Sequence, residues 1–186
     1  PPVTLSETHT NVTCNGLNNG IISIQTGSTN GYNVSYSIDG GANYQSSNIF
    51  NNLAPGTYTI TVKFTKGNRV CEYTIDVVIT EPPVLIGQSQ LVQPLTCATT
   101  GTIQAINVSG GTAPYQYSIN GVTFQNSNVF ANLNAGTYTI TIKDANNCTV
   151  TTTPITFVLP LPPTDLTFTS SSLTCPDLTS TITATI

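Results

Sequence analysis

The sequence predicts an all-β chain of tandem β-sandwich repeats, on the grounds of its composition, its strand periodicity and an internal repeat. Of its 186 residues, 38% are hydrophobic and only 6% are charged, and Met and Trp are absent. Val, Ile, Thr and Tyr are abundant, and these side chains suit a pleated, half-buried surface. Disordered chains combine low hydrophobicity with high net charge, whereas the formal net charge here is −4. The composition therefore favours a folded, strand-rich protein.

The internal repeat has an offset of about 80 residues. The segment FNNLAPGTYTITV at 50–62 matches FANLNAGTYTITI at 130–142, and Pro-Pro recurs at the start of each unit. A unit of this length can bury its own core, so we expect separate sandwiches in series. The expected units are repeat one, repeat two and the first strands of a truncated third repeat, at 1–81, 82–161 and 162–186. The partial third unit indicates a piece cut from a longer array.

Strand periodicity is clearest in the second repeat. Residues 102–108 and 137–143 alternate apolar and polar side chains, and Asn120-Gly121 is a strong hairpin signal. Further strands are expected at 85–93, 115–119 and 148–159. Short strands at this spacing predict a sandwich of the immunoglobulin type.

A repeated Leu-x-x-Gly-Thr-Tyr sequence places Tyr58 and Tyr138 at the start of a late strand. In immunoglobulin-like sandwiches a tyrosine at this position bonds back to the backbone and forms a tyrosine corner. We expect both side chains to be structural.

The five cysteines follow the repeat. Cys14 and Cys97 precede the second strand of their repeats, while Cys71 and Cys148 begin the last strand, so we predict the disulfides Cys14–Cys71 and Cys97–Cys148. Cys175 is the first cysteine of the third repeat, with its partner expected beyond the end of this segment. Disulfides imply an oxidising compartment, such as the periplasm, the cell surface or the medium.

Other kinds of site find little support. A zinc site needs clustered ligands, but His9 is the only histidine and the cysteines within a repeat lie far apart, so neither a metal nor a cofactor is expected. Asp144 and Asn146 offer fewer oxygens than Ca²⁺ requires and are read as a polar turn. Asp39 is replaced by Asn120 in the second repeat, which argues against a repeated catalytic acid. The sequence thus predicts no enzyme.

The charge balance excludes two classes of partner. Nucleic acids and anionic lipids are bound through Lys and Arg, of which there are only four. No run approaches the roughly 20 apolar residues of a membrane span, so no membrane insertion of this segment is expected.

The second repeat combines Cys97, the turn Gly110-Gly111-Thr112-Ala113-Pro114-Tyr115, Leu133-x-x-Gly136-Thr137-Tyr138 and Asp144-Ala145-Asn146-Asn147-Cys148. This pattern closely resembles the SprB-type repeat of giant cell-surface adhesins in gliding Bacteroidetes-type bacteria. Repeat one fits more loosely and lacks the Gly-Gly-Thr-Ala-Pro-Tyr turn. The resemblance implies an outer-surface protein exported by the type IX route, whose relatives contact the substratum during gliding.

Three roles remain open. The first is an extracellular adhesive shaft whose partners are neighbouring repeats of the same chain and the substratum or an extracellular polysaccharide. The second is a subunit of a self-assembled filament or sheath. The third is a glycan-binding accessory module of a secreted protein, which would expose aromatic rings on one face, with the candidates Tyr32, Tyr44, Tyr115 and Phe124.

Overall fold

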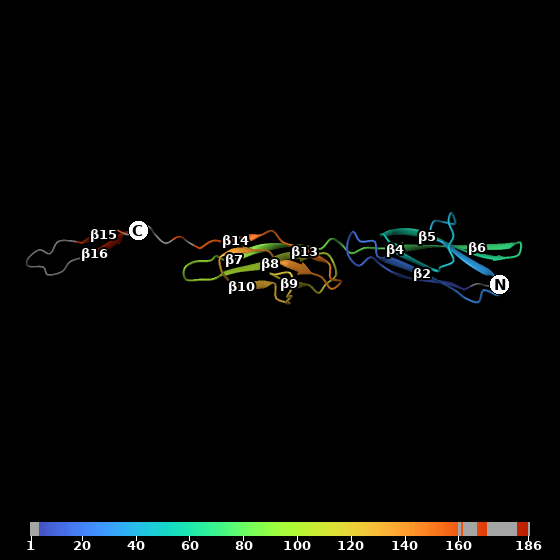
Figure 1. Ribbon diagram of the computed structural model, residues 1–186, viewed down its shortest axis with the longest axis horizontal. Coiled ribbons are helices and arrows are strands. Elements are labelled where there is room, and N and C mark those ends of the chain that lie inside the picture. Colours follow the sequence, from blue (N-terminus) through green and yellow to red (C-terminus); the bar gives the residue numbers. More distant parts are fainter. Residues whose placement is uncertain (1–3, 160, 162–166, 171–181, 186) are drawn as a thin grey trace, which may run out of the picture.

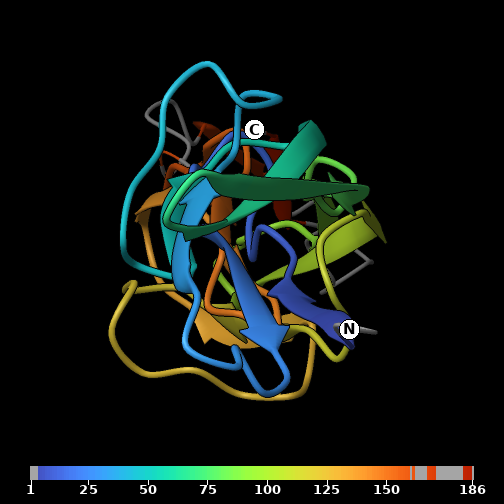
Figure 2. The same cartoon turned by 90° about the vertical axis from the view of Figure 1, so that its right-hand side faces the viewer.

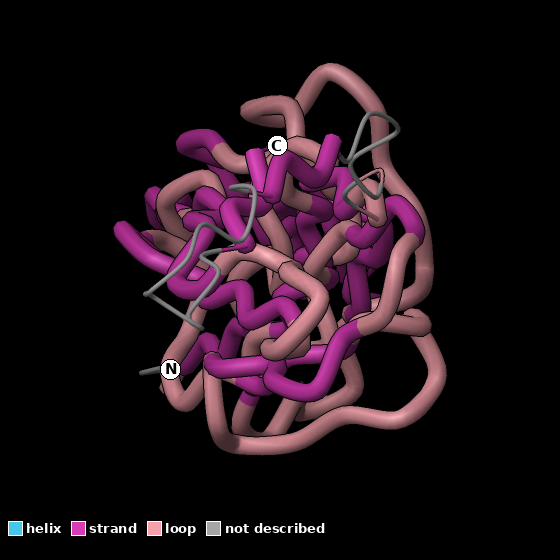
Figure 3. Tube along the Cα trace, turned by 90° about the vertical axis from the view of Figure 1, so that its left-hand side faces the viewer, coloured by secondary structure: helices cyan, strands magenta, loops and turns pink. Residues whose placement is uncertain are grey.

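The computed structural model describes residues 4–159, 161, 167–170 and 182–185. Its regular structure in these ranges consists of β-strands joined by loops (Figure 3). Two sandwiches with separate hydrophobic cores lie end to end along the long axis (Figure 1). The predicted fold class, all-β with tandem immunoglobulin-like sandwiches and a disulfide, is confirmed.

The first domain contains two three-stranded sheets, ordered β1-β2-β4 and β3-β5-β6. Its strands are β1 (Leu5–Thr10), β2 (Gly20–Thr26), β3 (Asn33–Ser37), β4 (Ile49–Leu53), β5 (Gly56–Lys66) and β6 (Arg69–Ile79). Alternate residues of β2 point inward, and Ile22 and Ile24 are fully buried with Ile60 and Val62 of β5. Burying each of these side chains stabilises the fold by roughly 1.5–3 kcal/mol.

The second domain repeats this arrangement, but the strands that correspond to β3, β5 and β6 are shorter, and the last two are divided. They are β7 (Ile86–Gln93), β8 (Gly101–Ser109), β9 (Gln116–Ser118), β10 (Val129–Leu133), β11 (Gly136–Tyr138), β12 (Thr141–Lys143), β13 (Thr149–Thr151) and β14 (Ile155–Phe157). The sheets are ordered β7-β8-β10, β9-β12-β13 and β11-β14. Ile103 of β8 and Ile140 and Ile142 opposite it are fully buried.

The last two predicted strands of this domain are each interrupted. The pairs Tyr138↔Ile155 and Thr141↔Thr151 differ by one residue in register, which marks a bulge. The buried Thr152 hydroxyl accepts a hydrogen bond from the Ile140 amide at 3.0 Å and so satisfies a backbone group at the break. In the first domain, by contrast, β5 and β6 pair continuously over eleven residues each.

The repeated Tyr/Phe-Gln-x-Ser-Asn sequence holds the loop before β4 and β10. Gln45 and Gln125 each donate side-chain hydrogen bonds to the backbone carbonyls two and four residues further on. Asn48 and Asn128 each donate to a carbonyl of the facing strand, at 2.7 and 2.8 Å. The motif therefore serves the fold in both domains.

The hairpin expected at Asn120-Gly121 is wrong. Only Gly121 has positive φ, whereas the tight turn typical of Asn-Gly needs positive φ at both residues. After this turn, the chain pairs with β9 only at the isolated antiparallel bridge Tyr117↔Gln125, and then continues to β10 in the other sheet. This long connection and its counterpart between β3 and β4 project from the molecule on different sides when it is viewed along its long axis (Figure 2).

Beyond the second domain, β15 (Thr167–Ser170) and β16 (Ile182–Thr185) pair antiparallel. The first two strands of each complete domain pair in the same sense. Cys175 lies outside the described residues.

Candidate functional site at the domain junction

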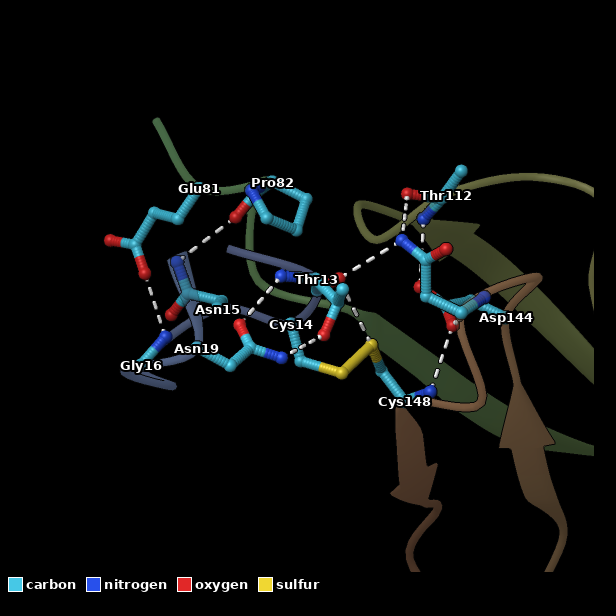
Figure 4. Close-up of a disulfide and its surroundings, with 11 residues drawn as sticks. Thr13, Cys14, Asn15, Gly16, Asn19, Glu81, Pro82, Thr112, Asp144 and Cys148 are labelled. Atoms are coloured by element: carbon cyan, nitrogen blue, oxygen red, sulfur yellow. Dashed lines mark hydrogen bonds between the residues drawn. A yellow bond between two sulfur atoms is a disulfide. The ribbon is translucent and has the colours of Figure 1, made fainter. Parts of the chain in front are cut away.

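The two domains are joined by a disulfide between Cys14 and Cys148, which are 134 residues apart in sequence (Figure 4). Their Cα atoms are 5.7 Å apart. Cys14 lies in the loop between β1 and β2, and Cys148 in the loop between β12 and β13. Cys71 and Cys97 are free and exposed.

The predicted pairings Cys14–Cys71 and Cys97–Cys148 are therefore wrong. The loop before the second strand and the start of the last strand lie at opposite ends of a sandwich. Val12, beside Cys14, bonds to Thr80 at one end of the β5–β6 ladder, whereas Cys71 pairs with Phe64 near the other end. Eight residues of strand separate these positions by about 25 Å, and a disulfide needs Cα atoms within about 7 Å.

On the second domain's side, Asp144 shapes the loop that carries Cys148. Its buried carboxylate accepts hydrogen bonds from the backbone amides of Asn146 and Cys148, at 2.9 and 2.8 Å, and from that of Thr112, at 2.8 Å. Because the same carboxylate binds the amides of both Cys148 and Thr112, it fixes the cysteine loop against the Thr112 turn. This geometry is that of a structural turn, as the sequence suggested, and no group of metal-binding side chains occurs among the described residues.

Asn146 connects this loop to the first domain. Its side-chain amide donates to the Thr13 carbonyl and to the Thr112 hydroxyl, both at 3.0 Å. The adjacent Gly-Gly turn fits closely between its neighbours: Gly111 has φ of 58°, and a Cβ there would lie 2.6 Å from the Asp144 carboxylate. The Gly111 amide also donates to the carbonyl of Pro83 in the linker, at 2.8 Å. The turn and the Asp-x-Asn-x-Cys loop thus form one socket.

On the first domain's side, the Cys14 loop is closed by paired hydrogen bonds. The Thr13 amide donates to the Asn19 side chain at 3.1 Å, and Asn19 donates back to the Thr13 hydroxyl at 2.7 Å. The loop is also hydrogen-bonded to the linker: the Gly16 amide donates to the Glu81 carboxylate at 2.7 Å, and the Asn15 side chain donates to the Pro82 carbonyl at 3.1 Å. The linker and the loop therefore form one unit.

Two cavities open to solvent also lie at the junction. One, of about 330 Å³, is lined by residues of the linker, the Cys14 loop and the socket. The other, of about 250 Å³, lies against the disulfide itself and Leu85. Asn15, Asn19, Glu81 and Asn146 contribute to the junction but were not predicted as site residues. The contact of Asn146 with Thr13 exists only when the second domain lies against the first. The other three bond within the Cys14 loop and to the linker, and no sequence motif marks those contacts.

The two predicted corner tyrosines each bond back to the backbone. The Tyr58 hydroxyl donates to the Ala54 carbonyl at 2.9 Å, and the Tyr138 hydroxyl donates to the Asn134 carbonyl at 3.2 Å. Tyr138 also packs edge-on against Phe157, with ring centroids 6.0 Å apart.

The candidate sugar-stacking rings do not form an open platform. The Lys63 ammonium lies 4.8 Å from the Tyr44 ring centroid, and that of Lys143 lies 4.1 Å from the Phe124 centroid. Burial, and then the hydrogen bond to Glu72, raises the pKa of Tyr44. Cation–π packing of this kind occupies one face of each ring. Tyr115 is tied to the Gly110 carbonyl at 2.7 Å, and Tyr32 lies beneath Lys66.

Asp39 and Asn120 have the same structural role. Each accepts a hydrogen bond from a buried serine hydroxyl, at 2.6 Å from Ser37 and 2.9 Å from Ser118. The Ser37 hydroxyl and then the backbone and side-chain amides of Asn43 hold the pKa of Asp39 well below its usual range. An acceptor oxygen is needed here rather than a charge, so Asp and Asn can replace one another.

The solved structures that match this chain are of low sequence identity. A C-terminal 282-residue fragment of intimin, in complex with the intimin-binding domain of the translocated intimin receptor, is 15% identical with a TM-score of 0.43, covering 84% of this chain and 64% of that one. Fibronectin(III)-like modules of Clostridium thermocellum CbhA are 13% identical with a TM-score of 0.33, covering 85% and 95%. The chain thus spans 64% of the length of the intimin fragment. With TM-scores this low, neither likeness bears on what the chain does.

No curated protein matches the sequence. Among the described residues, no helix is long and apolar enough to cross a membrane. The family model of the SprB repeat matches residues 89–124, a stretch that contains Cys97 and the Gly-Gly turn of the socket. The resemblance inferred from the sequence is confirmed there: residues 89–124 of the second domain match the SprB repeat.

Proposed function

We propose that this chain is a segment of the extracellular shaft of a long bacterial surface adhesin, with its sandwiches fixed end to end by an inter-domain disulfide. The SprB match supports a repeat region of a cell-surface adhesin. The observation that carries the shaft role is the Cys14–Cys148 bond. The proposal includes the domain boundaries 1–81, 82–161 and 162–186.

Two covalent connections cross the junction at different places. The linker runs through Glu81-Pro82-Pro83, where proline restricts the preceding residue to extended conformations. The disulfide forms the second connection, and the hydrogen bonds of Asn146 and Asn15 lie beside it. A junction with two separated attachments resists bending and twisting more than a single linker does, as a shaft requires.

The disulfide also supports the proposed location. Stable disulfides persist outside the reducing cytosol, which fits the outer bacterial surface. Export by the type IX route and a part in gliding belong to this proposal through the SprB resemblance. We take the segment to be non-catalytic, because its repeated polar side chains serve turns and the junction.

Contact with the substratum or an extracellular polysaccharide would use the neutral, amide- and hydroxyl-rich surface. Such binding should depend weakly on salt, since there is little Coulomb attraction to screen. The glycan-module alternative has less support, because the four candidate rings are covered by Lys side chains or tied to the backbone.

Small-angle X-ray scattering of the full chain tests the shaft role. We compare the variant Cys14→Ser/Cys148→Ser with the matched control Cys71→Ser/Cys97→Ser. The control should give one extended distance distribution, and the variant a broader one with a shorter mean length, because a single linker lets the domains bend. Identical distributions would show that the disulfide does not set the shape.

Labelling of intact cells with an antibody against residues 82–161 tests the location. Label on the cell surface supports an adhesin, and label that travels along the cell supports gliding. Signal confined to the medium would contradict the proposal and favour a secreted accessory module.

A further inference from the structure

The loop between β7 and β8 lies at the end of the second domain that points away from the first (Figure 1). This loop contains the free Cys97. We propose that Cys97 forms the next inter-domain disulfide, with the second cysteine of a following domain built like the second domain. The inference rests on the proposed shaft, and extends the bond seen once at Cys14–Cys148 to the next junction.

The loops around Cys97 and Cys14 share their construction. Each cysteine follows a threonine that closes the loop with hydrogen bonds: Thr13 with Asn19, and Thr96 with Thr99, whose hydroxyls are 2.7 Å apart. Two residues before each cysteine, an apolar side chain packs on the core of its own domain, Val12 in one case and Leu95 in the other.

The exit of the chain beside each loop is also the same. A glycine at the start of the second strand packs against the end of the last strand: a Cβ on Gly20 would lie 2.8 Å from Ile79, and one on Gly101 would lie 2.5 Å from Phe157. In both domains the outgoing linker therefore starts next to the cysteine loop. In the first domain, this placement is what brings the following domain's Cys148 to Cys14.

The far end of the second domain also exposes apolar side chains next to this loop. Val158, Leu159 and Leu161 follow β14 and are 73%, 62% and 90% exposed. At the first junction, the residues after β6 contact the Cys14 loop and the next domain. Docking of a following domain would remove this apolar surface from water.

Cys71 differs from Cys148, although the two match in register through the pairs Lys63↔Glu72 and Lys143↔Thr149. Beyond Cys71 the β5–β6 hairpin continues to Lys66↔Arg69, so it extends where the loop of a preceding domain would approach. The proposal therefore concerns Cys97.

The bond forms by two thiol–disulfide exchanges. The Cys97 thiolate attacks a low-molecular-weight disulfide such as oxidised glutathione, which gives a mixed disulfide and releases one thiol. The thiolate of the partner cysteine then attacks the Cys97 sulfur and releases the second thiol. In sum, two protein thiols lose two electrons and two protons, and one glutathione disulfide is reduced to two thiols.

The test inserts a second copy of residues 82–161 after Leu161 of the full chain. At the first splice point Leu161 is followed by Pro82-Pro83 of the inserted copy, and at the second the copied Leu161 is followed by Pro162-Pro163. Both therefore read Leu-Pro-Pro, as the natural sequence does at 161–163. In the inserted copy, Thr149→Ser distinguishes the Cys148 peptide, and Cys97→Ser removes the second Cys97, so that the original Cys97 is the one that is mapped. The protein is oxidised with glutathione disulfide, alkylated and mapped by mass spectrometry without reduction.

We expect Cys97 to be linked to Cys148 of the inserted copy, with complete loss of its alkylation, and Cys14 to be linked to the original Cys148. In a matched Cys97→Ser variant, Cys148 of the inserted copy should become alkylated. If Cys97 stays alkylated, or pairs with Cys71, while Cys14–Cys148 forms, this inference is overturned and the proposed shaft stands. If Cys14–Cys148 is also missing, both are overturned.

Discussion

Removal of the Cys14–Cys148 disulfide should destabilise both domains. When one domain unfolds and the other stays folded, the disulfide and the linker together close a loop of about 70 residues in the unfolded domain. In the chain-entropy model, closing a loop of this length stabilises the fold by about 4 kcal/mol. For domains of this size, that free energy corresponds to about 15–30 °C in Tm.

The assay is differential scanning calorimetry of the full chain without reductant. The variant Cys14→Ser/Cys148→Ser is compared with Cys71→Ser/Cys97→Ser, which changes two exposed cysteines and keeps the disulfide. The control should melt like the unaltered chain, and adding dithiothreitol to it should reproduce the low Tm of the variant. If the two variants melted within a few degrees of each other, the inter-domain loop-closure argument would be refuted.

Four further predictions concern single side chains. Asp144→Ala should destabilise the second domain by about 2–3 kcal/mol in urea unfolding, because three backbone amides lose a charged acceptor; an unchanged midpoint would contradict its role in the socket. Thr61→Val should stabilise the first domain by about 1 kcal/mol, because the Thr61 hydroxyl is buried without a hydrogen-bond partner, and a loss of stability would show an unseen partner. Tyr58→Phe should cost about 1 kcal/mol by removing the bond to Ala54, with Tyr73→Phe, an exposed ring, as control. The pKa of Asp39 is lowered in the folded state, so the stabilisation that its carboxylate gives the first domain is present above the ordinary carboxyl pKa of about 3.9 and is lost as the pH falls below that value. Asp39→Asn should therefore weaken the fall of Tm in acid. An unaltered pH profile of Tm would assign the acid dependence to other carboxylates.

The fold was accessible from the sequence because it depends on local signals. Alternation in 102–108 and the Gly-Thr-Tyr sequences at Tyr58 and Tyr138 report strand formation and a turn within a few residues. The bulge at Thr152 was not predicted, and the tight turn predicted at Asn120-Gly121 was wrong. Both features depend on contacts with facing strands. Propensity averaged along a segment carries no information on such contacts.

The disulfide pairing was missed for a topological reason. Cys14 and Cys71 belong to the same repeat and were therefore predicted to pair, but consecutive antiparallel strands place them at opposite ends of the sandwich. Following the strand directions along the repeat would have placed the two cysteines at opposite ends. Repeat one also has three more residues than repeat two between its corner tyrosine and its second cysteine, a second sign that the surroundings of Cys71 differ from those of Cys148. The socket itself was visible only as the Asp144-x-Asn146-x-Cys148 spacing, whose contact with Thr13 spans the two domains.

The position of the disulfide also decides which part of the chain carries a pulling force. Tension applied at the two ends passes from the first residues to Cys14, crosses the sulfur atoms and continues from Cys148. The 134-residue separation between these cysteines lies outside that path, and about 450 Å of extended chain cannot be drawn out while the bond holds. Under load, only the segments outside this loop, which include β1, β13 and β14, can be drawn out before a covalent bond must break. The resistance of the remaining chain to stretching therefore depends on a sulfur–sulfur bond more than on the folding stability of either sandwich.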